Sequence, residues 1–150
     1  MDLKSKKILV TGGAGFLGKH VVQKLIYRGV PRENISVPRS KEVDLRKKEN
    51  CSAAVRGQDI VIHLAGTTGG IAFHKEHPAQ TFYDNLMMGV ELIEAARVSG
   101  AMKFVTIGSA AEYPELAPLP IKEEDLWLGP SEEIHIPYAI AKKMLLVQTQ

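Results

Sequence analysis

Two side chains near the end of the sequence, Tyr138 and Lys142, can cooperate in moving a proton. Residues four apart lie on one face of a helix, within reach of each other or of a shared ligand. A free tyrosine titrates near pH ~10, so acid–base work near neutrality needs a shift of roughly 3 units, which a nearby ammonium favours. Ser109 adds a hydroxyl that can bind a reacting oxygen. We predict a catalytic group of Ser109, Tyr138 and Lys142; the alternative is an amphipathic helix with an exposed lysine.

A glycine-rich segment near the start of the sequence has the pattern of a phosphate-binding turn. It follows the apolar run Ile8-Leu9-Val10 and reads Thr11-Gly12-Gly13-Ala14-Gly15-Phe16-Leu17-Gly18. Gly12 permits a tight turn, Gly15 lets the backbone approach a pyrophosphate, and Gly18 lets the next helix pack closely on a sheet. The N–H groups and the dipole at the start of that helix favour an anion. We predict a dinucleotide site here; the alternative is a plain strand-to-helix turn.

The residues after the second predicted strand indicate which dinucleotide is bound. A carboxylate at that position would accept hydrogen bonds from the adenosine ribose and repel a 2′-phosphate. The sequence instead has Pro38-Arg39-Ser40-Lys41, where Arg39 can pair with a phosphate. We therefore predict NADP(H) in preference to NAD(H), which remains possible, and the alternative for Arg39 is a solvated basic turn. Asp44 is either an adenine contact or a helix cap or turn residue.

Alternating apolar runs and helical patterns must position these groups. Strands are predicted at 7–11, 35–37, 59–64 and 103–107, the last two as buried strands, and helices at 15–27, 47–55, 78–98 and from 137 onward without a visible stop signal. The first helix carries Phe16, Leu17, Val21, Leu25 and Ile26 near one face, and prolines predict an irregular loop over 114–136. This alternation predicts an α/β fold, a Rossmann-like doubly wound parallel sheet with helices on both faces.

Composition excludes several other classes of protein. The 150 residues are 45% hydrophobic and 24% charged, with a net charge of +2, which gives no reason to expect a nucleic-acid or membrane partner. The start of the sequence lacks the apolar stretch of a signal peptide. Cys51 is the single cysteine, which excludes an internal disulfide and favours a cytoplasmic location. We predict that residues 1–150 form one NAD(P)-binding domain.

The glycine spacing resembles that of the extended short-chain dehydrogenases/reductases, and further segments resemble their GDP-L-fucose synthase family. These segments are Val61-Ile62-His63-Leu64-Ala65-Gly66, Gly69-Gly70-Ile71, Asn85-Leu86-Met87-Met88-Gly89, Gly108 to Pro114 and Pro137 to Lys142. The resemblance implies an NADP(H)-dependent epimerase/reductase of a GDP-linked keto sugar, in which Tyr138 protonates an alkoxide and Lys142 also binds the nicotinamide ribose. It extends the expected cofactor site to Phe16, Leu17, Asp44, Leu64, Ala65 and Gly66. It further implies a homodimer through the helices at 78–98 and 137–150.

Two features separate this sequence from that family. The family has a Cys two residues after the catalytic Ser, as an acid/base for epimerisation, and here Ala111 has no proton to move. The sequence also ends eight residues after Lys142, so we expect a fragment whose last strands and substrate lobe lie beyond 150, with little or no turnover by itself. Two alternatives follow: an NAD-dependent nucleotide-sugar 4-epimerase or dehydratase, and a catalytically inert dinucleotide-binding or dimerising module.

Several other polar residues carry weaker hypotheses. His74 and His77 are too few for a metal site, so we predict no metal; they can instead approach a substrate phosphate. We interpret His63 as a packed strand residue and Cys51 as a small buried hydrophobe. Asn85 either orients backbone, serves a proton relay or points to solvent, and Trp127 is a candidate anchor for the proline-rich loop.

Overall fold

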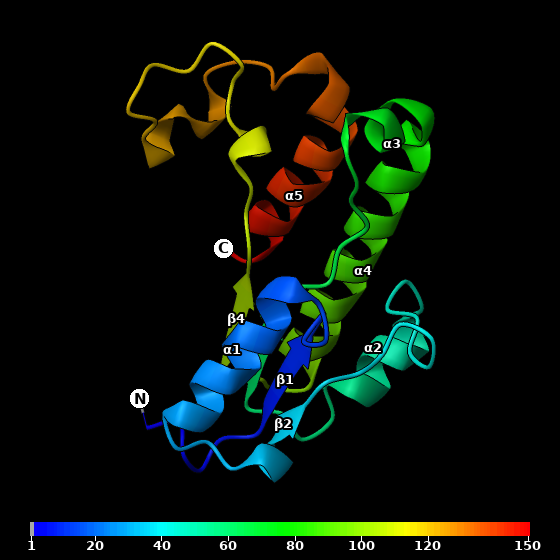
Figure 1. Ribbon diagram of the computed structural model, residues 1–150. Helices are drawn as coiled ribbons and strands as arrows, with labels where there is room; N and C mark the ends of the chain where they lie inside the picture. The colour runs from blue at the N-terminus through cyan, green and yellow to red at the C-terminus, as the bar shows by residue number, and fades with distance from the viewer. Residues whose placement is uncertain (1) are drawn as a thin grey trace. The chain divides into compact units, whose positions relative to one another are not determined.

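The computed structural model describes residues 2–150, which form two compact units (Figure 1). The first unit contains the chain up to Gly66 together with Met87–Ile107, and the second contains Thr67–Leu86 and Gly108–Gln150. The predicted cofactor residues up to Gly66 therefore belong to the first unit, apart from Tyr138 and Lys142. The predicted catalytic residues belong to the second. The assignment of the whole chain to one cofactor-binding domain stays a prediction.

A parallel sheet forms the centre of the first unit. Its strands are β1 (Ile8–Thr11), β2 (Ile35–Ser36), β3 (Ile60–His63) and β4 (Lys103–Thr106), in the order β2-β1-β3-β4. Ile8 lies opposite Ile35 on one side and Ile60 on the other, and all pairings are parallel. The chain turns from β1 outward to β2 and then returns to the other side of β1, as a doubly wound sheet requires. The predicted fold class is confirmed.

Two hydrophobic clusters sandwich this sheet because successive strand residues point to opposite faces. On one face Leu9 and Val61 pack with α2 (Lys48–Ala54) and the later part of α4 (Pro78–Val98), including Leu92. On the other face Ile8, Val10 and Ile60 pack with α1 (Phe16–Tyr27). All four residues of β1 are buried, as expected for a central strand covered on both faces.

Two expectations about this unit were wrong in detail. The buried face of α1 is made by Gly18, Leu25 and the half-buried Val21 and Val22, because Gly18 brings the helix against the turn. Of the apolar set predicted to share one face, Phe16, Leu17 and Ile26 are exposed. Strand β4 is also not buried: its residues are exposed or half-buried, because it is the edge strand of the sheet and has a neighbour on one side only.

The second unit is helical and contains elements that the sequence reading missed. A short helix α3 (Ile71–Glu76) follows Gly70, where no element was predicted. The predicted irregular loop 114–136 contains two 3-10 helices, η3 (Glu123–Trp127) and η4 (Glu133–His135), preceded by η2 (Ala110–Glu112). In the last helix, α5 (Ile136–Gln148), the Thr149 hydroxyl donates to the carbonyls of Leu145 and Leu146.

Asn85 ties the start of this unit together. Its side-chain amide donates to the carbonyls of Thr67 and Thr81, at 2.7 Å each, and its oxygen accepts from the Thr67 N–H at 3.1 Å. The residue is buried, so the alternative that it points to solvent was wrong. Because these bonds join the segment before α3 to the first turns of α4, Asn85 orients backbone.

Candidate functional site

The glycine turn lies at the carboxyl end of β1, where the strand order reverses between β1 and β3. Ligands of open parallel sheets bind at this kind of crevice. Gly12 has φ of +67°, a conformation that favours glycine, and a Cβ there would lie 2.7 Å from the Ala65 nitrogen. A Cβ at Gly18 would lie 2.2 Å from the Gly12 carbonyl oxygen. Both glycines are therefore required by the fold itself.

Gly15 differs from these two glycines. Its φ of −75° and ψ of −177° suit any residue, and a Cβ there would have its nearest neighbour, the Gly12 oxygen, at 3.2 Å. Gly15 is exposed and is the N-cap of α1, and within the described chain no side chain caps this helix and no acidic residue lies in its first turn. A small residue at an open, uncapped helix start is what a bound anion requires.

The ends of two other strands adjoin the turn and extend the candidate cofactor site. The Ala65 N–H donates to Thr11 Oγ1 at 3.3 Å, which keeps the segment Leu64-Ala65-Gly66 beside the turn. A Cβ at Gly13 would lie 2.8 Å from Val37, so the end of β2 lies against the turn as well. The fold thus brings the glycine turn together with the segments that follow β2 and β3, as predicted.

Beyond β2, the two charged candidates differ in their contacts. Arg39 is exposed and begins a turn in which its backbone carbonyl accepts the N–H groups of Glu42 and Val43. The Arg39 side chain is available to a ligand. Asp44 is engaged within the protein: its carboxylate pairs with Arg46 at 2.9 Å. That hydrogen-bonded partner lowers the pKa of Asp44 to about 2. The carboxylate also accepts the Arg46 N–H, the geometry of a turn residue.

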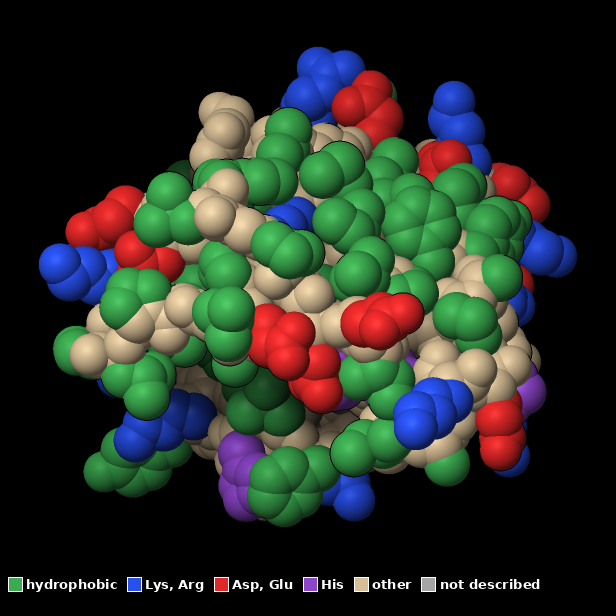
Figure 2. Space-filling view, turned by 90° about the horizontal axis from the view of Figure 1, so that it is seen from above, with side chains coloured by type: hydrophobic (Ala, Val, Ile, Leu, Met, Phe, Trp, Pro, Cys, Tyr) green, Lys and Arg blue, Asp and Glu red, His purple; other side chains and the backbone are tan. Residues whose placement is uncertain are grey.

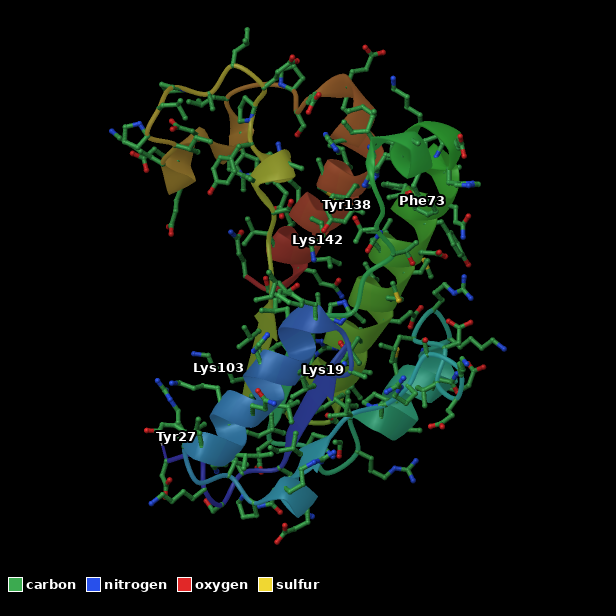
Figure 3. The ribbon with its side chains drawn as sticks, viewed as in Figure 1. Lys19, Tyr27, Phe73, Lys103, Tyr138 and Lys142 are labelled. Carbon is green, nitrogen blue, oxygen red and sulfur yellow. The ribbon has the colours of Figure 1, made fainter. Side chains whose placement is uncertain are left out.

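The predicted catalytic residues come together in the second unit. Tyr138 and Lys142 lie one turn apart on α5 (Figure 3), and α5 packs against η2, which Ser109 precedes. The Ser109 side chain is near enough to Tyr138 to lower the pKa of the tyrosine hydroxyl. Tyr138 and Lys142 are both half-buried. The three side chains therefore form one local group, with a hydroxyl pair beside an ammonium.

The pKa of Tyr138 shifts in the direction opposite to our expectation. Burial raises it most, the Glu112 carboxylate raises it further, and the hydrogen bond to Ser109 opposes both. Burial lowers the pKa of Lys142, and Glu112 opposes that shift. In this chain by itself, burial and the Glu112 charge disfavour the Tyr138 phenolate more than Lys142 stabilises it. Tyr138 is therefore protonated and neutral.

The sequence analysis did not single out Glu112, and it gave His74 a different role. Glu112 is 4% exposed and its carboxylate accepts the backbone N–H of Ser109. The spacing of Ser109 and Glu112 is that of a capping box, a signal that the sequence did contain. His74 is also buried, with its ring 5.7 Å from that of Tyr138 and 5.2 Å from that of His135. Only the fold reveals this contact.

The remaining candidates are structural. His63 is buried in β3 and its Nδ1 lies 2.7 Å from Thr11 Oγ1, which confirms a packed strand residue. Cys51 is fully buried, donates to the Leu45 carbonyl, and burial raises its pKa to about 12. Trp127 is 57% exposed, with the Lys143 Nζ 5.1 Å from its ring centre. Among residues 2–150, no three His, Cys, Asp or Glu side chains gather in a way that would hold a metal ion.

The comparison with known families covers the glycine turn of the first unit and the catalytic group of the second. The profile of the NAD dependent epimerase/dehydratase family matches residues 8–150, from β1 to the end of α5. The chain belongs to this family. No helix within the described residues is long and apolar enough to cross a membrane.

Family members with named activities are similar over most of this chain. The GDP-L-fucose synthase of Azorhizobium caulinodans is 33% identical over 141 residues, covering 93% of this chain and 44% of the relative. The GDP-mannose 3,5-epimerase of Arabidopsis thaliana is 33% identical, covering 81% and 37%. The GDP-mannoheptose C4 reductase of Campylobacter jejuni, solved with NADP bound, is 27% identical with a TM-score of 0.89, covering 96% and 46%. The chain thus spans less than half the length of these family members.

Proposed function

We propose that this chain is the cofactor-binding part of an NADP(H)-dependent reductase or epimerase of nucleotide-linked sugars, with GDP as the favoured nucleotide. The observation that carries this proposal is the exposed Gly15 at the uncapped start of α1, because its backbone conformation is one that any residue can adopt. The pyrophosphate would lie on Gly12, Gly15, Phe16, Leu17 and Gly18, with Leu64, Ala65 and Gly66 beside it. Arg39 would pair with the adenosine 2′-phosphate.

When bound, the reduced nicotinamide supplies a hydride to the carbonyl carbon of a keto sugar. Ser109 would donate a hydrogen bond to the carbonyl oxygen, on which negative charge develops. Tyr138 would give its phenolic proton to that oxygen, so the tyrosine O–H bond breaks as the alcohol O–H bond forms. Lys142 would stabilise the resulting phenolate, which then takes a proton from solvent. The neutral resting state of Tyr138 supports this direction of reaction.

Within this function, we favour reduction without epimerisation. Ala111 lies in η2, two residues after Ser109, and its side chain offers no proton at the place where the GDP-L-fucose synthase pattern has a cysteine. Similarity to a C4 reductase is in keeping with this choice. An NAD-dependent 4-epimerase or dehydratase is less well supported, because the exposed Arg39 occupies the place of a ribose-binding carboxylate.

The test is to incubate the protein with NADPH and a GDP-4-keto-6-deoxyhexose in deuterated water, and to locate deuterium in the product by NMR. Conversion of only part of the keto sugar is enough to locate the deuterium in the product. We expect reduction at C4 with no deuterium at C3 or C5 beyond that of a Tyr138→Phe control, because epimerisation exchanges those positions. Deuterium at C3 and C5 would contradict reduction alone. NADPH binding with no conversion would instead support the inert dinucleotide-binding module.

We also propose a homodimer and a cytoplasmic location. Ile136, Ile140 and Val147 are 37%, 38% and 51% exposed and lie along one face of α5, where a second copy would cover them. The reduced, buried Cys51 is compatible with a reducing compartment.

A further inference from the structure

Glu112 is a buried acid that the mechanism above does not use. Its side chain accepts the N–H of Ser109, and its backbone carbonyl accepts the Ser131 hydroxyl at 3.2 Å. The Ser109 hydroxyl in turn accepts the Ala111 N–H at 3.2 Å. A buried carboxylate is costly unless hydrogen bonds or opposite charges compensate it. These contacts fix both ends of η2, so Glu112 sets the position of Ser109.

The opposite charges near Glu112 come from α5, which packs against η2. Burial raises the pKa of Glu112, and the Ser109 N–H, Lys142 and Lys143 oppose that shift by favouring the ionised carboxylate. Lys143 is committed elsewhere: it is 4% exposed, and its Nζ donates to the Leu126 carbonyl at 2.8 Å and lies over the Trp127 ring. Lys142 is therefore the cation of the candidate catalytic group that offsets the negative charge of Glu112.

The Glu112 carboxylate also affects Tyr138, whose charged form it disfavours. Its negative charge disfavours a phenolate and favours the ammonium of Lys142. His74 on α3 is a further titratable side chain beside Tyr138, and His135 at the start of α5 contacts His74 in turn. Glu112 thus favours the protonated form of both residues, adding to the effect of burial on Tyr138 and opposing it on Lys142.

We propose that Glu112 is a positioning residue that prepares this site to give a proton: it fixes Ser109 through the backbone N–H and opposes negative charge on the Tyr138 oxygen. The inference rests on the proposed function, because a tyrosine that protonates a new alkoxide must begin neutral. An enzyme that begins by oxidising an alcohol needs the phenolate instead. Glu112 therefore favours carbonyl reduction as the direction of the first step.

The test is Glu112→Gln, which keeps an oxygen for the Ser109 N–H and removes the charge. Tyr138 is titrated by phenolate absorbance, with Tyr138→Phe in each background to assign the signal. Lys142 is titrated by NMR of its Nζ. We expect the titration midpoints of both residues to fall, that of Tyr138 by about one pH unit. The control Glu123→Gln removes an exposed carboxylate and should leave both midpoints in place.

The pair of readouts separates lost charge from simple loosening. If the substitution merely admitted water, relief of burial would lower the midpoint of Tyr138 but raise that of Lys142. That result, or unchanged midpoints, would overturn the inference. If Glu112→Gln fails to fold, Glu112→Asp gives the same test, since withdrawing the charge by one methylene should lower both midpoints by less. Neither titration needs cofactor or substrate, so the proposed function can fail separately, by failure to bind NADPH.

Discussion

Gly12, Gly15 and Gly18 share one motif but are glycines for different reasons. Gly12 needs a positive φ, and Gly18 leaves no room for a Cβ beside the turn. Gly15 has an ordinary conformation and faces solvent, and a Cβ there would lie 3.2 Å from the Gly12 oxygen; we predict that a bound pyrophosphate is the main reason for its lack of a side chain. The sequence pattern predicted these roles correctly for Gly12 and Gly18, while that of Gly15 stays a prediction.

Alanine substitutions at Gly15 and Gly18 should therefore have opposite effects. Gly15→Ala should unfold at nearly the same denaturant concentration as the wild type but bind NADPH about tenfold or more weakly, because its Cβ lies where the pyrophosphate approaches. Gly18→Ala should lose about 3 kcal/mol of unfolding free energy, because the helix must move away from the turn. Urea denaturation and NADPH titration check both variants. Full NADPH affinity in Gly15→Ala would count against a pyrophosphate at this position.

At the scale of elements, the strands and the long helices were predictable and the second unit was less so. The helix Pro78–Val98 was predicted at its observed bounds because proline marks its start and glycine follows its end. Helix α3 was missed because it is short and follows two glycines. The half-buried state of β4 depends on its place at the edge of the sheet. The order of the strands cannot be predicted from the local periodicity of the sequence.

Asn85 carries a prediction about how these elements are joined. Asn85→Ala should lower the free energy of unfolding by about 3 kcal/mol, because it leaves the half-buried N–H and C=O of Thr67 without their partner and removes a second donor from the Thr81 carbonyl. Gln80→Ala, at an exposed position of the same helix, should change it by less than about 0.5 kcal/mol. Equal effects of the two substitutions on chemical denaturation would mean that Asn85 does not hold this junction.

At the scale of the whole molecule, apolar surface indicates where other protein is expected to bind. The segment 114–128 presents Leu116, Leu119 and Leu128 at 92%, 86% and 73% exposure. It is drawn at the top of Figure 1, and Figure 2, which looks down on that face, shows apolar side chains gathered there. The exposed stripe of α5 is the more regular surface, because its residues repeat at helical spacing.

The exposed apolar residues along one face of α5, Ile136, Ile140 and Val147, predict a homodimer. The wild type should sediment as a dimer at micromolar concentration, and Ile140→Glu should sediment as a monomer, because a charge would be buried in the interface. Leu116→Glu places the same charge on the exposed loop and should leave the dimer intact. A monomeric wild type, or dissociation by the loop variant but not by Ile140→Glu, would contradict dimerisation through α5.

The most direct test of the proposed function is a titration of this protein with NADPH and with NADH, followed by cofactor fluorescence. We expect NADPH to bind more tightly than NADH, and Arg39→Ala to weaken NADPH by about tenfold while leaving NADH unchanged. Arg56→Ala, which removes an exposed arginine after α2, is the matched control and should change neither affinity. Binding of neither dinucleotide, or an NADPH preference that survives Arg39→Ala, would contradict the cofactor site described above.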